Sequence, residues 1–249
     1  GKVKEAVEGC DTVFHNAARS SAPMHKENPA EGARINIEGF VNVVEEAMDQ
    51  DVEKVVYAST SSMYGSVEPP HREDMGEKPT NRYSASKMAR ELYADVYAQK
   101  GLDITGIRYF SVYGPREKAK GRFANIISQF LWKMLDDESP KVFGDGEQTR
   151  DFTFVKDIAR ANILAAEKGE SGQYYNIGTG QETSFNTVVD KLNEELGKDI
   201  EPEKVDNPIK NYVRRTKADF SRAKEDLGYE PEYSFEAGLK ETVEYYRNN

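Results

Sequence analysis

Cysteine is almost absent from this sequence, as are long apolar runs and any excess of positive charge. The single cysteine, Cys10, can form no disulfide within the chain, which predicts a protein of the reducing cytoplasm. No apolar run approaches the ~20 residues of a membrane-spanning helix, and no signal sequence is visible. Lysine and arginine number 34 against 44 aspartates and glutamates, so the net charge is -10. We therefore expect neither nucleic acid nor a membrane as a partner.

Histidine is also scarce, with 3 in the chain. His25 and His71 fall in predicted loops with no second ligand nearby, and His15 ends a predicted strand, where a structural role is the simpler interpretation. A zinc site needs three or four converging side chains of this kind. The sequence therefore predicts no metal site.

What is present is an alternation of short apolar runs with amphipathic segments, which is typical of an α/β fold. Strands are predicted at residues 11–15, 54–59 and 103–109, and helices at 29–50 and 83–100. This β-α-β-α-β order predicts a parallel sheet with right-handed crossovers.

Beyond residues 114–116 the predicted strands become shorter and helices more frequent, which indicates a second, smaller lobe. We expect residues 1–110 to form the sheet domain and residues 111–249 to form mainly the smaller α/β lobe, with some segments returning to the sheet. The predicted helices of this part are 122–135, 157–167, 184–196, 219–227 and 234–246, and its predicted strands are 141–143, 152–154 and 173–177.

Tyr83 and Lys87 stand four residues apart at the start of a predicted helix, so they share one face, a turn apart. A free tyrosine titrates near ~10, about three units too high for a general base at neutral pH. A cation beside the phenol favours the phenolate and closes part of that gap. The alternative is a solvated surface pair, because any helix can carry Tyr and Lys at this spacing.

Unusual residues also follow three predicted strands. The first strand ends in the small residues of 15–18, the second in the hydroxyl cluster of 58–62, and the third in residues 108–111. Ligands of open parallel sheets bind beyond the carboxyl ends of the strands. Serine and threonine clusters are also common in turns, but three such ends at one edge, next to the Tyr83 helix, favour a binding site.

These segments, in this order, resemble the extended short-chain dehydrogenase/reductase family and in particular its nucleotide-sugar epimerases of the UDP-glucose 4-epimerase type. The resemblance covers nearly the whole chain and implies a Rossmann-like doubly wound parallel sheet, an NAD cofactor and a nucleotide-diphosphate sugar as substrate. The matching segments are Val13-Phe14-His15-Asn16-Ala17-Ala18, Asn36-Ile37-Glu38-Gly39, Ser59-Thr60-Ser61-Ser62-Met63-Tyr64-Gly65, Tyr83-x-x-x-Lys87, Arg108-Tyr109-Phe110-Ser111-Val112-Tyr113-Gly114-Pro115-Arg116, Gln148-Thr149-Arg150-Asp151-Phe152 and Tyr175-Asn176-Ile177-Gly178-Thr179-Gly180.

The resemblance also implies roles for single residues. Tyr83 would be the acid/base on the sugar 4-hydroxyl, Lys87 its partner and a ligand of the nicotinamide ribose, and Thr60 a hydrogen-bond partner of the same hydroxyl. The NAD-lining positions would be Ala17, Ala18, Asn36, Ser59, Tyr83, Lys87 and Tyr109, and the substrate contacts Phe110, Ser111, Asn125 and Arg150. Many relatives carry Asn where this chain has Ser111. Members of the family usually form homodimers through two helices, here near residues 35–50 and 86–100.

Two other reactions are known in the same family. Sugar 4,6-dehydratases carry an Asp-Glu pair just after the Thr60 position, where this chain has Ser61 and Ser62, so dehydration ranks low. A nucleotide-heptose 6-epimerase is a closer alternative, because residues 113–121 and 138–141 resemble that subgroup. Asn125 favours the 4-epimerases. A non-catalytic protein that binds nucleotide sugars is the remaining class.

The front of the chain departs from the family pattern. The family opens with strand–Gly-x-x-Gly-x-x-Gly–helix, whose amides hold the cofactor diphosphate, and no segment before Cys10 fits this pattern. We expect an N-terminally truncated sheet, short of roughly two βα units. Either the sequence is a piece of an ordinary epimerase, or the strand at 11–15 lies at a bare edge that favours self-association and impairs activity.

Overall fold

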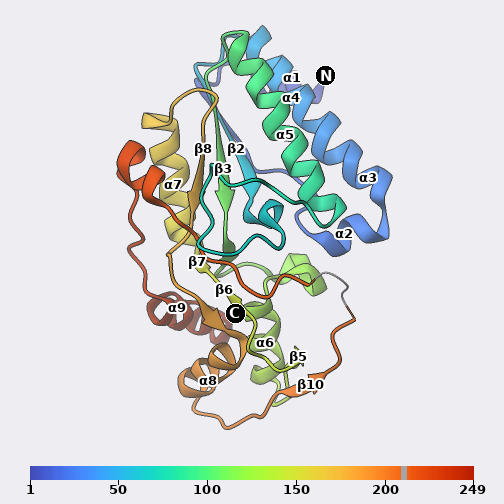
Figure 1. Ribbon diagram of the computed structural model, residues 1–249, viewed down its shortest axis with the longest axis vertical. Helices are drawn as coiled ribbons and strands as arrows, with labels where there is room; N and C mark the ends of the chain where they lie inside the picture. Colours follow the sequence, from blue (N-terminus) through green and yellow to red (C-terminus); the bar gives the residue numbers. More distant parts are fainter. Residues whose placement is uncertain (209–211) are drawn as a thin grey trace.

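The computed structural model describes residues 1–208 and 212–249. Within these residues, the centre of the molecule is a four-stranded parallel sheet in the order β1-β2-β3-β8 (Figure 1). The strands are β1 Thr12–His15, β2 Lys54–Thr60, β3 Ile104–Tyr109 and β8 Tyr174–Ile177. The α/β class and the parallel sheet predicted from the sequence are confirmed.

Helices cover both faces of this sheet (Figure 1). Residues of α4 Gly39–Asp49 and α5 Arg82–Gln99 pack on one face, and residues of α7 Val155–Lys168 on the other. Strand β2 alternates between the two layers, since Val55 and Tyr57 join the first cluster and Val56 the second. Burial on both faces explains why β2 reads as a nearly continuous apolar run.

The helix predicted at residues 29–50 is helical throughout but not uniform. It consists of α3 Pro29–Ala33, the π-helical turn η1 Arg34–Glu38 and α4. The π-helical turn places the amide side chain of Asn36 in a fully buried position. Two short helices precede this segment: α1 Lys2–Val7 contacts α4, and α2 Ala22–Glu27 contacts α5.

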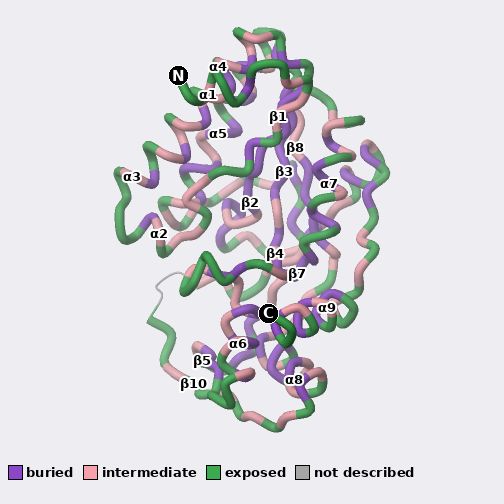
Figure 2. Tube along the Cα trace, turned by 180° about the vertical axis from the view of Figure 1, so that it is seen from behind, coloured by how far each residue is buried: buried purple, intermediate pink, exposed green. Residues whose placement is uncertain are grey.

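A smaller lobe lies beyond the carboxyl ends of the sheet strands, and Figure 2 shows that it has buried residues of its own. Its helices α6 Ile126–Leu135, α8 Phe185–Leu196 and α9 Phe235–Arg247 share an apolar cluster that includes Leu131, Val188 and Leu239. The short strands of this part are β4 Ser111–Tyr113, β5 Lys141–Phe143, β6 Thr149–Arg150, β7 Phe152–Phe154, β9 Thr183–Ser184 and β10 Glu203–Val205. Helix α7 and strand β8 return to the sheet, whereas a domain boundary at residue 110 stays a prediction.

Two predicted helices of the smaller lobe are shorter than expected. The segment 122–135 divides into the 3-10 turn η3 Lys118–Phe123 and α6, because Ala124 is extended and Asn125 caps α6 by accepting the N–H of Ile127 at 3.0 Å. The segment 219–227 becomes helical only near the π-helical turn η4 Ala223–Leu227.

Strand β1 forms one edge of the described sheet. In residues 1–208 and 212–249 it pairs with β2 alone, and Phe14 is 45% exposed. An unpaired strand edge offers free N–H and C=O groups to another strand. The predicted self-association through this edge stays a prediction.

None of the helices in the described part of the chain has the length and apolar character needed to cross a membrane.

Candidate active site

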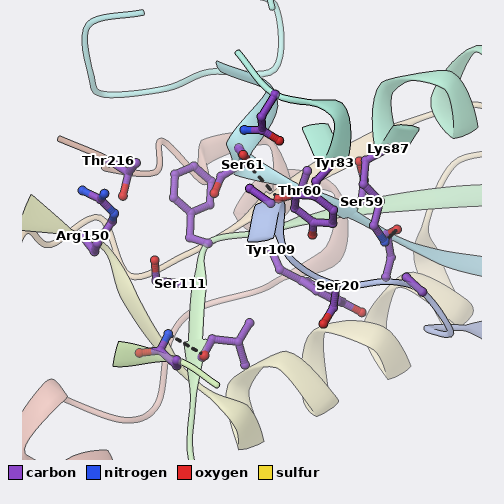
Figure 3. Close-up of a pocket in the computed structure, with 18 of the residues that line it drawn as sticks. Ser20, Ser59, Thr60, Ser61, Tyr83, Lys87, Tyr109, Ser111, Arg150 and Thr216 are labelled. Atoms are coloured by element: carbon purple, nitrogen blue, oxygen red, sulfur yellow. Dashed lines mark hydrogen bonds between the residues drawn. The ribbon is translucent and has the colours of Figure 1, made fainter. Parts of the chain in front are cut away.

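A cavity of about 600 Å³ opens where the carboxyl ends of the sheet strands face the smaller lobe (Figure 3). This volume lies within the usual range for small-molecule sites. The cavity is lined by the predicted site residues Ala18, Ser59, Thr60, Tyr83, Lys87, Tyr109, Phe110, Ser111, Asn125 and Arg150. The three strand ends and the Tyr83 helix therefore meet at one place, as the sequence predicts.

Helix α5 positions the tyrosine and the lysine. The Asn81 side chain caps the helix by accepting the N–H of Ser84 at 3.0 Å, which places Tyr83 in the first turn and Lys87 one turn later. The Lys87 ammonium is buried and donates to the carbonyl of Ala58 at 2.7 Å. Figure 3 shows both side chains beside Thr60 at the end of β2.

Burial and the neighbouring charge of Arg90 shift the pKa values of Tyr83 and Lys87. Burial raises the pKa of the Tyr83 phenol above its usual value, while a hydrogen bond with Thr60 and the charge of Arg90 lower it. Burial also lowers the pKa of the Lys87 ammonium well below its usual range, and Arg90 lowers it further. The sequence predicts Lys87 as the cation that favours the phenolate, and in the structure the charge that lowers the pKa of the phenol is that of Arg90.

Ser59 and Thr60 have different surroundings although they are adjacent in β2. The Ser59 hydroxyl donates to the Glu91 carboxylate at 2.5 Å, and Arg108 holds the same carboxylate with contacts of 3.0 and 2.7 Å. The Thr60 Oγ1 accepts the N–H of Ser62 at 3.2 Å. Ser59 therefore ties the strand to α5, whereas Thr60 faces Tyr83.

Arg150 projects from the smaller lobe toward the cavity (Figure 3). Its guanidinium lies 5.3 Å from the ring centroid of Tyr212 and 5.5 Å from that of Phe185, and it donates to the carbonyl of Thr149 at 2.7 Å. Burial lowers the pKa of Arg150, and Tyr212 raises it. Aromatic rings and backbone carbonyls leave the positive charge available to an anionic ligand.

Asn125 lines the cavity, but its amide is already engaged. Its Nδ2 donates to the carbonyl of Val112 at 2.9 Å, and its Oδ1 caps α6. The predicted contact with substrate stays a prediction, because the same amide holds the lobe helix against β4.

Two predicted NAD-lining residues, Ala17 and Asn36, do not line the cavity. The Asn36 side chain is buried behind it, where its Nδ2 donates to Ser86 Oγ at 2.9 Å and its Oδ1 accepts the N–H of Arg19 at 2.8 Å. The carbonyl of Ala17 accepts a hydrogen bond from Arg90. The π-helical turn directs the Asn36 side chain into the interior, and the contacts of Ala17 and Asn36 with NAD stay predictions.

Several cavity residues had no individual role predicted from the sequence. Ser61 and Ser62 belong to the predicted hydroxyl cluster of residues 58–62, and Asn81 directly precedes the predicted Tyr83 helix. Tyr212 and Thr216 come from a distant loop, and no local pattern marks them. Among the described residues, no group of three His, Cys, Asp or Glu side chains is placed to hold a metal ion.

A parallel sheet covered by helices on both faces, with a tyrosine and a lysine one helical turn apart at its carboxyl edge, fits the class of extended short-chain dehydrogenases/reductases that the sequence resembles. The model of the NAD dependent epimerase/dehydratase family matches residues 1–178, and the chain belongs to this family.

Similar proteins agree with this assignment. The chain is 38% identical over 245 residues to a putative UDP-glucose 4-epimerase of Methanocaldococcus jannaschii, which covers 96% of the chain and 78% of the relative. It is 40% identical over 240 residues to a UDP-glucuronate 4-epimerase of Thermodesulfobacterium geofontis. This match covers 95% of the chain and 72% of the relative. The crystal structure of a UDP-glucose 4-epimerase of Thermotoga maritima with UDP-glucose matches with a TM-score of 0.94 and 38% identity, over 99% of this chain and 81% of that one.

Proposed function

We propose that the cavity is the active site of an NAD-dependent epimerase that inverts C4 of a nucleotide-diphosphate sugar, of the UDP-glucose/UDP-galactose type. The observation that carries this proposal is the convergence of Thr60, Tyr83 and Lys87 on one cavity, with the guanidinium of Arg150 on its other side (Figure 3). A pure binding site has no need of a phenol beside cations.

The residues of the cavity fit the nicotinamide half of NAD. Lys87 has donors beyond the one used by Ala58, and the small side chain of Ala18 leaves room for a flat ring. Tyr83, Lys87 and Tyr109 would hold the nicotinamide ribose side. Bound NAD would supply the redox chemistry, by accepting the hydride from C4 and returning it. Ahead of β1 the sequence has glycine only at positions 1 and 9, so the fit concerns this half alone.

Each protein side chain then has a defined task. The Tyr83 phenolate takes the proton of the sugar 4-hydroxyl and returns it, and Thr60 hydrogen-bonds the same oxygens during the transfer. The guanidinium of Arg150 binds the diphosphate, which a chain of net charge -10 would otherwise repel. Phe110 and Ser111 would lie between the reacting sugar and the diphosphate, where the sheet meets the smaller lobe.

The cavity wall favours epimerisation over dehydration. Elimination of the 6-hydroxyl requires an acid beside it, and carboxyl groups supply this role most simply. Ser61 and Ser62 occupy the position after Thr60, and no Asp or Glu is found among the described residues that line the cavity.

The experiment is a substrate panel of UDP-glucose, UDP-galactose, UDP-glucuronate and an ADP-heptose with added NAD, with products identified by NMR. We expect inversion at C4, and Tyr83→Phe should reduce turnover by about 10²–10⁴-fold while sugar-nucleotide affinity is retained. The matched control is Tyr245→Phe, a half-buried tyrosine of α9 far from the cavity. An unchanged rate in Tyr83→Phe would refute the assignment, and inversion at C6 would transfer it to the heptose subgroup.

NAD binding by this chain is tested separately, by a melting-temperature shift on addition of NAD. A shift with NAD that is reduced in Lys87→Met supports the cofactor site. No shift, with a folded protein, would favour the alternative of an impaired fragment that binds nucleotide sugars.

We further propose that the chain forms a homodimer through the helices near residues 35–50 and 86–100. On α5, Leu92 is 60% exposed and Val96 48% exposed, and both lie one turn apart with Tyr93 beside them. Such a patch on a helix is typical of a protein interface. Light scattering should give a dimer for the chain and a monomer for Leu92→Glu, and a monomeric parent chain would contradict the proposal.

A further inference from the structure

Arg90 is a fully buried cation on α5, one turn beyond Lys87. Its Nε donates to the carbonyl of Asn36 at 2.6 Å, its Nη2 to that of Ala17 at 2.9 Å, and its Nη1 lies 3.5 Å from that of Ala58. These carbonyls belong to three separate segments: the π-helical turn η1, the loop after β1, and strand β2. A single side chain therefore joins the segments that surround Tyr83 and Lys87.

The charge of Arg90 is not neutralised by an acidic side chain in the described part of the structure. Its neighbours are the three carbonyls and the ring of Phe40, whose centroid is 5.5 Å away. Glu91, the acidic residue next to it on α5, is held by Arg108 and Ser59. A buried charge is costly unless it is compensated, so this guanidinium requires an explanation beyond packing.

We propose that Arg90 is a positioning residue of the active site, whose permanent charge stabilises the phenolate of Tyr83 and whose hydrogen bonds fix the segments around it. The inference rests on the proposed function only in taking Tyr83 as the base. A purely structural arginine would hold the three carbonyls without affecting the charge state of the phenol.

Lys87 and Arg90 differ in how well they keep their charge. Burial lowers the pKa of Arg90 to about 10, so the guanidinium is still protonated at neutral pH. The pKa of Lys87 falls well below its usual range, and Arg90 contributes to that fall. The charge of Arg90 also lowers the pKa of the Tyr83 phenol against the effect of burial. Arg90 therefore stays positively charged at neutral pH and acts on the phenol.

In the described part of the structure, the groups from β2 and α2 that face Tyr83 carry no charge at pH 7. Thr60 from β2 is neutral, and the His25 ring from α2 packs edge-on at 5.7 Å from the Tyr83 ring. Burial lowers the pKa of His25, and burial followed by Arg90 and Lys87 lowers that of His15 to about 3, so both imidazoles are neutral at pH 7. On α5 itself Glu91 opposes the cations, but its carboxylate is already paired with Arg108.

The test measures the titration of the phenol directly, without cofactor or substrate. Tyr83 is replaced by 3,5-difluorotyrosine, whose phenol is more acidic than that of tyrosine, and its ionisation is followed by fluorine NMR. We expect Arg90→Met to raise the midpoint by about one pH unit or more, a tenfold loss of phenolate stability, and Arg90→Lys to restore most of it. Arg247→Met, at the end of α9, is the matched control and should change nothing.

An unchanged midpoint in folded Arg90→Met would overturn the proposal, as would a shift in Arg90→Lys as large as that in Arg90→Met. Circular dichroism checks folding. If Arg90→Met does not fold, Arg90→Gln decides, because it keeps hydrogen-bond donors and removes the charge, and an unchanged midpoint in that variant overturns the proposal. Because no turnover is measured, failure of epimerase activity and failure of this inference are distinguishable.

Discussion

Replacement of Glu91 by glutamine should destabilise the protein strongly, because this carboxylate is the centre of a buried network. It accepts from Ser59 Oγ at 2.5 Å and from the Arg108 guanidinium at 3.0 and 2.7 Å. Arg108 is itself fully buried and also contacts Glu77 at 2.6 Å and the Tyr64 hydroxyl at 2.8 Å. Glu91→Gln thus removes one of two carboxylates from a guanidinium that has no access to water.

The magnitude follows from these contacts. Removal of one member of a buried ion pair costs about 3–5 kcal/mol, because it leaves the other charge uncompensated. Glu77 still faces Arg108, so we expect the lower part of this range, roughly 3 kcal/mol. Ser59→Ala removes a single hydrogen bond to a charged group, for which about 1.5–3 kcal/mol is expected.

The assay is urea unfolding at pH 7, followed by circular dichroism, with the free energy of unfolding compared between variants. Glu244→Gln, an exposed position of α9, is the control and should change stability by less than about 0.5 kcal/mol. A loss below about 1 kcal/mol for Glu91→Gln would refute the reasoning, since it would show that the pair behaves like a surface ion pair.

Two further predictions concern the sheet. Gly106→Ala should lower the free energy of unfolding in urea by about 1–3 kcal/mol, because its Cβ would lie 2.6 Å from the Tyr57 hydroxyl. Gly76→Ala, whose Cβ would meet open space, is the control. Equal urea midpoints for the two variants would contradict the prediction. His15 stays neutral in the fold, its pKa lowered to about 3 by burial and then by Arg90 and Lys87, whereas the unfolded chain binds a proton below about 6.5. Stability should therefore fall from pH 6.5 toward pH 3, by up to about 1.4 kcal/mol per pH unit, and less steeply in His15→Gln; parallel slopes for the two proteins would disprove it.

Features set by near neighbours in the sequence were predictable. The spacing of Tyr83 and Lys87 requires only that residues 83–100 be helical, and the common edge of β1, β2 and β3 follows from the parallel order. Both expectations needed the type of each element and not its exact bounds.

Features set by contacts between distant segments were not predictable from the sequence. Asn36 sits in a helical pattern that reads the same whether its amide faces the cavity or the interior, and only the π-helical turn decides. Arg90 looks like any charged residue of an amphipathic helix until Ala17, Asn36 and Ala58 are brought around it. Tyr212 reaches the cavity from a loop with no periodic pattern at all.

The division of the cavity between two parts of the chain has a kinetic consequence. Thr60, Tyr83 and Lys87 stand on β2 and α5, which Glu91 and Ser59 tie together, whereas Arg150 stands on the smaller lobe. Under the proposed function, the reacting groups and the guanidinium that binds the diphosphate stand on different parts of the structure. Substitutions in the smaller lobe can therefore alter KM and the range of sugar nucleotides accepted. The kcat for a sugar that is bound in the correct position beside Tyr83 is preserved.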